Sequence, residues 1–193
     1  MLKLNGKSDE SFYTWIQQVG DVDLLLKTYA VNVAVGMWDD YWNNANNYYI
    51  YFNTTDPLNY QFFFIPYDYD NTLGTSINGG AQSDSGRQNP LKWGRDEYPL
   101  IRRLLAFPDF KAKYIGYLKE LAADDGLFNI KASKPRIIAW QNKIRDYIAN
   151  DTGQDMQLRD EPASWGNHPE YRLLEEGPNN FFQVKTGVIN ALP

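Results

Sequence analysis

Residues 38–66, WDDYWNNANNYYIYFNTTDPLNYQFFFIP, decide how this chain folds. They contain two aromatic runs, residues 48–52 and 60–65, whose side chains favour strands. The residues between the runs, NTTDP at 53–57, are typical turn formers. We therefore predict one β-hairpin with a loop longer than two residues, and Pro66 ends its second strand.

Carboxylate and amide side chains gather at both ends of this hairpin. Because a hairpin brings its two ends together, we expect the two groups to meet in one small volume. Oxygen ligands of this kind suit Mg²⁺, Mn²⁺ or Ca²⁺, and a divalent cation would offset the repulsion between like carboxylates. One group precedes the hairpin and the other follows it: Asp39, Asp40, Asn44 and Asn47, then Asp68 and Asp70.

The spacing of Asp39 and Asn44 supports this interpretation. The pair has the Asp-x-x-x-x-Asn pattern of the protein kinase catalytic loop, in which the Asp accepts the substrate hydroxyl proton and the Asn holds a metal. In kinases a metal-binding Asp then follows a β-hairpin, and Asp68 occupies that place here. The pair alone would more often mark a loop, whereas the pair, the hairpin and Asp68 together favour a metal site.

A calcium loop is the alternative, because Asp68, Asp70 and Thr72 alternate as they do in an EF-hand. The sixth position of such a loop would be Leu73 where an EF-hand has glycine, and the twelfth would be Gly79 where it has Glu. The EF-hand is therefore excluded, and a calcium site of another type stays an alternative.

Two helices are predicted before the hairpin. Ser8 and Asp21 are good N-cap residues, and the helices that they begin are expected to end near Gly20 and Met37. The second helix is apolar nearly all round, which is typical of a central, buried helix.

The part of the chain after the hairpin is predicted to be a long loop, residues 74–96, followed by helices. Apolar stripes indicate three helices and a short final one, with Ser133 as the N-cap of the third. We therefore predict a single, mainly helical α+β domain over residues 1–193. The stripes are Leu100, Ile101, Leu104 and Leu105; Phe110, Tyr114, Tyr117, Leu118 and Leu121; Ile137, Trp140, Ile144, Tyr147 and Ile148; and Phe181, Val184 and Val188.

Composition excludes several classes of protein. The 19 Lys and Arg residues against 24 Asp and Glu give a net charge of −5, which disfavours a duplex nucleic acid partner. The absence of cysteine excludes thiolate metal sites, a cysteine nucleophile and disulfides. The sequence contains no run of 18 apolar residues, so it predicts no membrane-spanning helix. The single histidine, His168, lies in a turn-like Asn-His-Pro context and is interpreted as a loop residue.

Two segments resemble the signatures of CotH-type proteins. Residues 38–51 resemble the pattern W-D-x-Y-x-x-N-x-x-N-Y-Y-L-Y. Residues 64–74, FIPYDYDNTLG, resemble I-P-W-D-x-D-x-x-F-G, with a Tyr for Trp and a Leu for Phe as mild departures. Residues 98–105, YPLIRRLL, resemble a later helix of the family, and a looser similarity covers residues 21–192.

CotH-type proteins are atypical, kinase-like secreted or spore-coat proteins that phosphorylate Ser on coat proteins, and relatives occur in bacterial cellulosomes. The resemblance implies ATP as the phosphate donor, Mg²⁺ or Mn²⁺ as the metal, a protein phosphoacceptor, and an extracellular, cell-surface or spore-coat location. It implies Asp39 as the catalytic Asp. It implies Asn44, Asn47 and Asp70 as cofactor-binding residues, and Asp68, Asp70 and Asn44 as metal ligands.

The resemblance also carries an expectation about architecture. The family has an N-terminal lobe with a phosphate-binding Lys, whereas Lys3 and Lys7 lie in no strand-like context. We therefore expect the chain to be the C-terminal lobe of a kinase-like fold, weak or inactive in phosphate transfer by itself. One alternative is a non-catalytic extracellular scaffold that binds carbohydrate or protein through the aromatic rings around Trp42, Tyr48 and Trp93. A second alternative is a calcium-stabilised extracellular domain.

Overall fold

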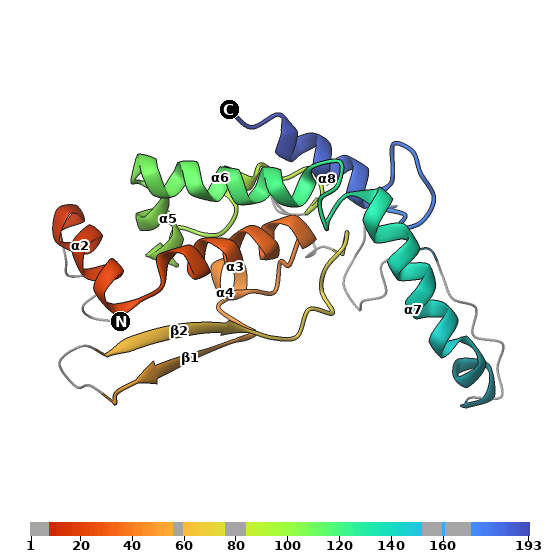
Figure 1. Cartoon of the computed structure of the whole chain (residues 1–193), viewed down its shortest axis with the longest axis horizontal. Helices are drawn as coiled ribbons and strands as arrows, with labels where there is room; N and C mark the ends of the chain where they lie inside the picture. Colours follow the sequence, from red (N-terminus) through yellow and green to blue (C-terminus); the bar gives the residue numbers. More distant parts are fainter. Residues whose placement is uncertain (1–7, 56–59, 76–83, 152–159, 161–170) are drawn as a thin grey trace.

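A computed structural model of the chain describes residues 8–55, 60–75, 84–151, 160 and 171–193. The fold is mainly helical with one two-stranded antiparallel sheet, which confirms the predicted α+β class (Figure 1). His168 lies outside the described residues. In chain order the elements are α2 (Asp9–Val19), α3 (Val22–Val35), α4 (Tyr41–Asn44), β1 (Tyr48–Asn53), β2 (Gln61–Pro66), the 3₁₀ helix η1 (Pro90–Lys92), α5 (Pro99–Leu105), α6 (Pro108–Ala122), α7 (Ile130–Asp151) and α8 (Phe181–Asn190).

The first two helices begin at the predicted caps. The Ser8 hydroxyl and the Asp21 carboxylate each accept a hydrogen bond from the backbone N–H three residues further on, at 3.4 Å and 2.9 Å. The second helix, α3, ends at Val35 and not at Met37, because Gly36 adopts a left-handed φ of 68° and closes it. A Cβ atom at position 36 would also lie only 2.9 Å from the Ser85 hydroxyl. Both the backbone conformation and the lack of space therefore require glycine at this position.

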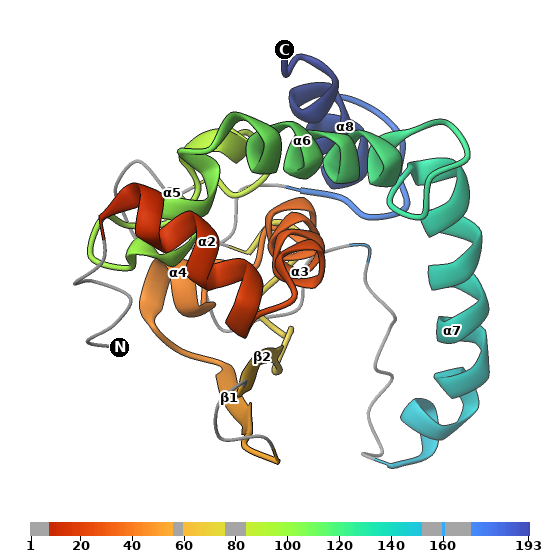
Figure 2. The same cartoon turned by 60° about the vertical axis from the view of Figure 1, so that its left-hand side comes forward.

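Helix α3 lies at the centre of the molecule and packs along α6 (Figures 1 and 2). The prediction of a helix buried all round is wrong in part, since Leu24 and Val31 are 46% and 39% exposed. One polar residue, Asn32, is fully buried on α3. The apolar residues that α3 contributes to the core are Val22, Leu25, Leu26, Tyr29, Ala30, Val33 and Ala34.

The predicted hairpin is confirmed, with strands shifted by about one residue. β1 and β2 pair from Tyr48 opposite Pro66 to Asn53 opposite Gln61. The inner face packs on the core, where the Phe64 ring stacks on Tyr48 with centroids 5.4 Å apart. The outer face carries exposed apolar side chains, among them Tyr49, Tyr51, Ile65 and Tyr67.

Helix α7 begins before its predicted cap, and part of its apolar stripe lies outside the core. It begins at Ile130, and Ser133 lies inside it with its hydroxyl donating to the carbonyl of Leu127. Asn129 takes the position before the helix, and its side-chain oxygen accepts the N–H of Lys131. Trp140, Ile144 and Tyr147 of the stripe are exposed and not part of the core, because α7 extends away from the body of the molecule (Figure 2).

Helix α8 buries a lysine. Lys185 is fully buried, and its ammonium group donates to the carbonyl of Ser85 at 2.8 Å and lies 5.0 Å from the centre of the Trp93 ring. Burial lowers the pKa of Lys185 to about 7, although the nearby Asp84 carboxylate acts in the opposite direction. In the part of the chain that the structure describes, no helix is both long and apolar enough to cross a bilayer.

Lys185 predicts a pH dependence of stability. Between pH 7 and 10 the unfolded chain holds a proton on this amine that the folded chain has lost, so the free energy of unfolding should rise with pH. The methionine of the variant Lys185→Met does not titrate. Between pH 7 and 9 the free energy of unfolding of the wild type should therefore rise by roughly 2–3 kcal/mol more than that of Lys185→Met. Urea unfolding of both proteins at the two pH values measures the difference, and equal slopes for the two proteins would contradict the assignment.

Candidate functional site

The loop before the hairpin is built on the buried carboxylate of Asp40. One oxygen accepts the backbone N–H and the side-chain amide of Asn43, at 2.9 and 3.1 Å, which begins the four-residue helix α4. The other accepts from the amide of Asn32 on α3 at 3.3 Å and from the indole N–H of Trp93 at 3.4 Å. This segment therefore contains one short, capped helix, and Asp40 is a structural residue.

Asp39 differs from Asp40, because within the described part of the chain its carboxylate accepts hydrogen bonds from side-chain amides alone. Its Oδ1 accepts from the amide of Asn44 at 2.6 Å. Its Oδ2 accepts from Asn46 at 3.2 Å and from Asn47 at 3.1 Å. Asp39 is buried at 6% exposure, so three neutral donors hold a nearly buried carboxylate in one orientation.

The segment after the hairpin is fastened to the first loop and to α3. The N–H of Tyr67 donates to the carbonyl of Asn47 at 3.0 Å. The Tyr69 hydroxyl donates to the side-chain oxygen of Asn32 at 2.7 Å, and the N–H of Leu73 donates to the carbonyl of Val35 at 2.7 Å. Asn32 thus bonds both segments, since its amide nitrogen binds Asp40 and its oxygen binds Tyr69.

Tyr67 lies where the two acidic segments meet. Desolvation raises the pKa of its hydroxyl, and the neighbouring Tyr49 and the charges of Asp68 and Asp39 act in the same direction. Its ring stacks on Tyr49 with centroids 4.8 Å apart. The expectation that the two ends of the hairpin meet is therefore confirmed for the backbone, by the hydrogen bond between Tyr67 and Asn47.

Asp68 and Asp70 are both exposed, in contrast to Asp39. Asp68 adopts a left-handed φ of 57°, a conformation that Asp tolerates better than most residues and that turns the chain directly after β2. The Thr72 hydroxyl donates to the carbonyl of Tyr69 at 2.8 Å and stabilises the turn that carries Asp70. The structure therefore presents these two carboxylates to solvent beside the Asp39 loop.

The donor set decides which metal the site fits. Among the described residues, no three His, Cys, Asp or Glu side chains gather closely enough to hold a metal ion. Mg²⁺ commonly binds through one or two carboxylates together with substrate phosphates and water, whereas Ca²⁺ takes six to eight protein and water oxygens. The exposed carboxylates of Asp68 and Asp70 and the amide oxygens fit a cation that arrives with a phosphorylated ligand better than a resident one.

Sequence reasoning found Asp39, Asn44 and Asn47 but missed three supporting residues. Asn46 gives Asp39 a third amide, while Asn32 and Tyr69 join the two loops through α3. Asn46 lies in the same polar run and was visible in the sequence. Asn32 had one signal, a lone amide inside an otherwise apolar helical stretch, whose buried polar side chain needs partners.

The fold and the site define a mainly helical α+β protein with a carboxylate and amide cluster at the base of its hairpin. Over residues 1–173 the chain matches the family described as CotH kinase protein, and it belongs to that family. No curated protein matches the chain.

Asp40 generates a prediction about stability. Burial raises the pKa of its carboxyl to about 7, whereas in the unfolded chain this group titrates near 3.8. The folded state therefore takes up a proton between pH 4 and 7, and the contribution of Asp40 to the free energy of unfolding falls as pH rises through that range. Asp40→Asn keeps an N-cap side chain but does not titrate.

Between pH 4.5 and 7.5 the free energy of unfolding of the wild type should fall by roughly 2–4 kcal/mol more than that of Asp40→Asn. Urea unfolding of both proteins at the two pH values checks this. A wild type that loses no more than the variant would show that Asp40 does not titrate in this window.

Proposed function

We propose that this chain is a kinase-type phosphotransferase that uses ATP and Mg²⁺ or Mn²⁺ to phosphorylate a hydroxyl of a protein, such as a serine. Membership of the CotH kinase family supports this class of activity. The observation that carries the proposal is the Asp39 carboxylate, held by Asn44, Asn46 and Asn47 next to the segment that bears Asp68.

In this proposal Asp39 is the catalytic residue that orients the acceptor hydroxyl and receives its proton. A carboxylate offers about four acceptor sites, and the amides occupy three, so one remains for a hydroxyl. Because the donors are neutral amides, they fix the carboxylate without adding a competing positive charge. Such fixed positioning is the main contribution a protein makes to phosphoryl transfer.

The remaining predicted residues are proposed to hold the metal and the nucleotide. Asn44 and Asn47 point their amide nitrogens at Asp39, which leaves their side-chain oxygens as acceptors for a cation. Asp68 and Asn44 would be ligands of the metal ion, and Asp70 would be a second acidic ligand. The two carboxylates would supply the negative charge that a divalent cation needs. A bound divalent cation would neutralise the charge of the phosphates.

The architecture supports a kinase-like C-terminal lobe. A helical body carries, in order, the Asp39 loop, a hairpin and Asp68, which is the order of catalytic loop, hairpin and metal-binding Asp in kinases. The strands of the described residues are β1 and β2 alone, so the sheet that clamps the nucleotide in kinases is not among them. We therefore expect weak ATP binding and little transfer from this chain by itself. CotH proteins are associated with the spore coat, and we propose an extracellular or coat location.

A carbohydrate- or protein-binding scaffold is the second candidate function. Of the three rings first considered for it, Trp42 and Trp93 are buried and present no face to a ligand, and Tyr48 is half-buried. The outer face of the hairpin does present such rings, with Tyr49 62% and Tyr51 57% exposed. Polysaccharide binding that is lost in Tyr51→Ala and retained in Asp39→Asn would favour this function.

The central test separates binding from transfer. Asp68→Asn removes the charge and keeps a residue that tolerates the left-handed backbone. It should weaken binding of ATP in the presence of Mg²⁺ by at least about tenfold, measured by calorimetry. Asp39→Asn should bind ATP as weakly as the wild type does and lose even the small amount of γ-phosphate transfer that the wild type performs, measured with labelled ATP and a protein acceptor.

Asp124→Ala is the matched control, because this exposed carboxylate lies in the turn after α6 and forms an ion pair with Lys131. It should behave as the wild type in both assays. Normal binding and normal transfer in both Asp39→Asn and Asp68→Asn would refute the proposal.

The donor set also predicts how metal binds. Mn²⁺ alone should show no saturable binding at micromolar concentrations, because the described residues supply too few ligands for a resident ion. Mn²⁺ with ATP should bind together, and Asp68→Asn should abolish the joint binding. Tight binding of Ca²⁺ without nucleotide, with a large rise in melting temperature, would instead identify a calcium-stabilised domain.

A further inference from the structure

Helix α7 carries an apolar face that the rest of the described chain leaves uncovered. Trp140, Ile144 and Tyr147 follow one another at helical spacing and are 57%, 48% and 77% exposed. The helix extends away from the body of the molecule (Figure 2). Large apolar side chains that gather on one exposed face mark a surface that contacts another molecule.

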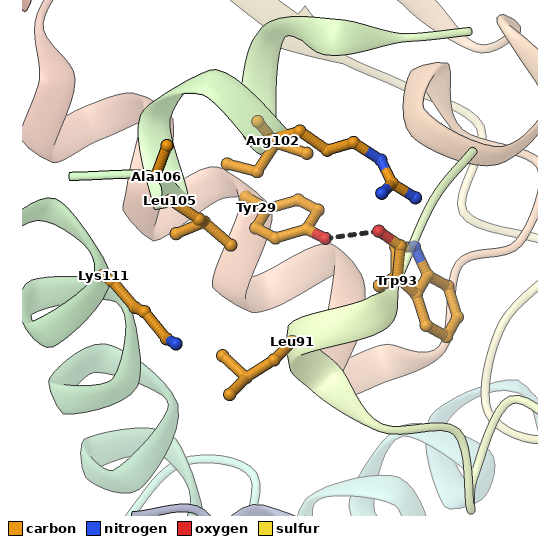
Figure 3. A pocket seen from close by; sticks show the side chains of 8 residues that line it. Tyr29, Leu91, Trp93, Arg102, Leu105, Ala106 and Lys111 are labelled. Atoms are coloured by element: carbon orange, nitrogen blue, oxygen red, sulfur yellow. Dashed lines mark hydrogen bonds between the residues drawn. The ribbon is translucent and has the colours of Figure 1, made fainter. Parts of the chain in front are cut away.

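This face continues into a groove of about 320 Å³ in the first half of α7. Apart from Ser133 and Arg136, the lining of the groove is apolar. The pocket beside Tyr29, in contrast, has the charged side chains of Arg102 and Lys111 in its lining (Figure 3). The groove is therefore the better receptor for an apolar side chain of a partner. Its lining residues include Val31, Leu73, Leu127, Ile137, Trp140 and Phe182.

Positive charges flank the apolar face of α7. The helix contains five Lys or Arg residues against two Asp, in a chain whose net charge is −5. Two of the cations, near the start of the helix, form ion pairs with carboxylates of neighbouring segments. Lys143 and Arg145, further along, are exposed and form no ion pair within the described part of the chain. With about 3.6 residues per turn, they lie on either side of the stripe that Trp140 and Ile144 define.

The outer face of the hairpin has the opposite character. Tyr49, Tyr51 and Ile65 lie on this face and are 62%, 57% and 46% exposed, and Tyr49 pairs with Ile65 across the strands. Residues 38–86 contain six Asp and no Lys, Arg or His. The carboxylates of Asp68 and Asp70, which follow β2, are exposed. The hairpin therefore presents apolar rings beside negative charges, whereas α7 presents apolar side chains beside positive charges.

We propose that the hairpin of one copy of this chain docks on α7 and its groove in a second copy. The opposite charges would attract one another, and each apolar face would cover the other. The hairpin protrudes from the helical body, and a concave groove suits such a projection better than the flat surface of a membrane (Figure 1). Because the two contacting surfaces differ, the association is head to tail and continues into rings or chains of molecules. It does not depend on the proposed phosphotransferase activity.

Sedimentation of the whole chain tests the self-association. The weight-average mass should rise with protein concentration between about 1 and 500 µM, a range that suits a small, transient interface. Raising the ionic strength from about 0.05 to 0.5 M should lower the association constant at least about threefold, because salt screens exposed charges. A chain that stays monomeric at every concentration, or an association constant that salt leaves unchanged, would overturn the proposal.

Two variants separate the two sides of the contact. Trp140→Asp alters α7 and Tyr51→Asp alters the hairpin, and both positions are exposed, so the fold should be retained. Each variant should self-associate at least about tenfold more weakly than the wild type. An equimolar mixture of the two should form a dimer and nothing larger, because one variant keeps an intact hairpin and the other an intact α7. Leu24→Ser is the control, since Leu24 is 46% exposed but belongs to neither surface; it should associate as the wild type does.

The double variant Lys143→Glu, Arg145→Glu tests the charges without touching the apolar residues. It should also associate at least about tenfold more weakly. Circular dichroism melting of every variant checks that the fold is intact. Wild-type association in Tyr51→Asp would show that α7 pairs with itself, and a mixture that stays monomeric would exclude the head-to-tail contact. A monomeric wild type that binds anionic lipid vesicles or polysaccharide would assign these faces to another partner and overturn the proposal.

Discussion

The buried carboxylate of Asp40 is the interaction on which the rest of this structure depends. It receives hydrogen bonds from three separate segments: Asn32 on α3, Asn43 at the start of α4, and Trp93 in the segment before α5. Burying a carboxylate is unfavourable unless such donors satisfy it, so the three segments must assemble together around it. Since Asp39 is the next residue along the chain, its position follows from that of Asp40.

The same group connects the candidate site to the body of the fold. Asn32 binds Asp40 with its nitrogen and Tyr69 with its oxygen, so one amide on the central helix fixes both the Asp39 loop and the loop that carries Asp68 and Asp70. Asp39 itself has no bond to α3 among those of the described residues and is held by amides of its own loop. The buried Asp40 network thus adjoins a second group of polar side chains, in which Asp39 and Asn47 are buried and Asn44, Asn46, Asp68 and Asp70 are exposed.

The sequence allowed the hairpin, the first helix caps and the approach of the two ends of the hairpin to be predicted, because each rests on local chemistry. Ser8, Asp21 and the aromatic runs act within a few residues of themselves. The structural role of Asp40 could not be predicted, since only the fold brings Asn32, Asn43 and Trp93 around its carboxylate. The start of α7 was misplaced for a similar reason: Ser133 is a good cap by type, but its hydroxyl is taken by the carbonyl of Leu127. The exposure of α7 beyond Ile137 could not be predicted either, because an apolar stripe does not show whether anything packs on it.

The burial of Lys185 has a consequence for how the end of the chain can be observed. Its amine is enclosed between the Ser85 carbonyl and the Trp93 ring, while the other lysines of the described residues all have solvent access. An amine-acylating reagent can reach Lys185 only when α8 leaves the body, by local opening or by global unfolding. The rate of its modification, compared with that of the accessible lysines, therefore measures how often the C-terminal helix detaches.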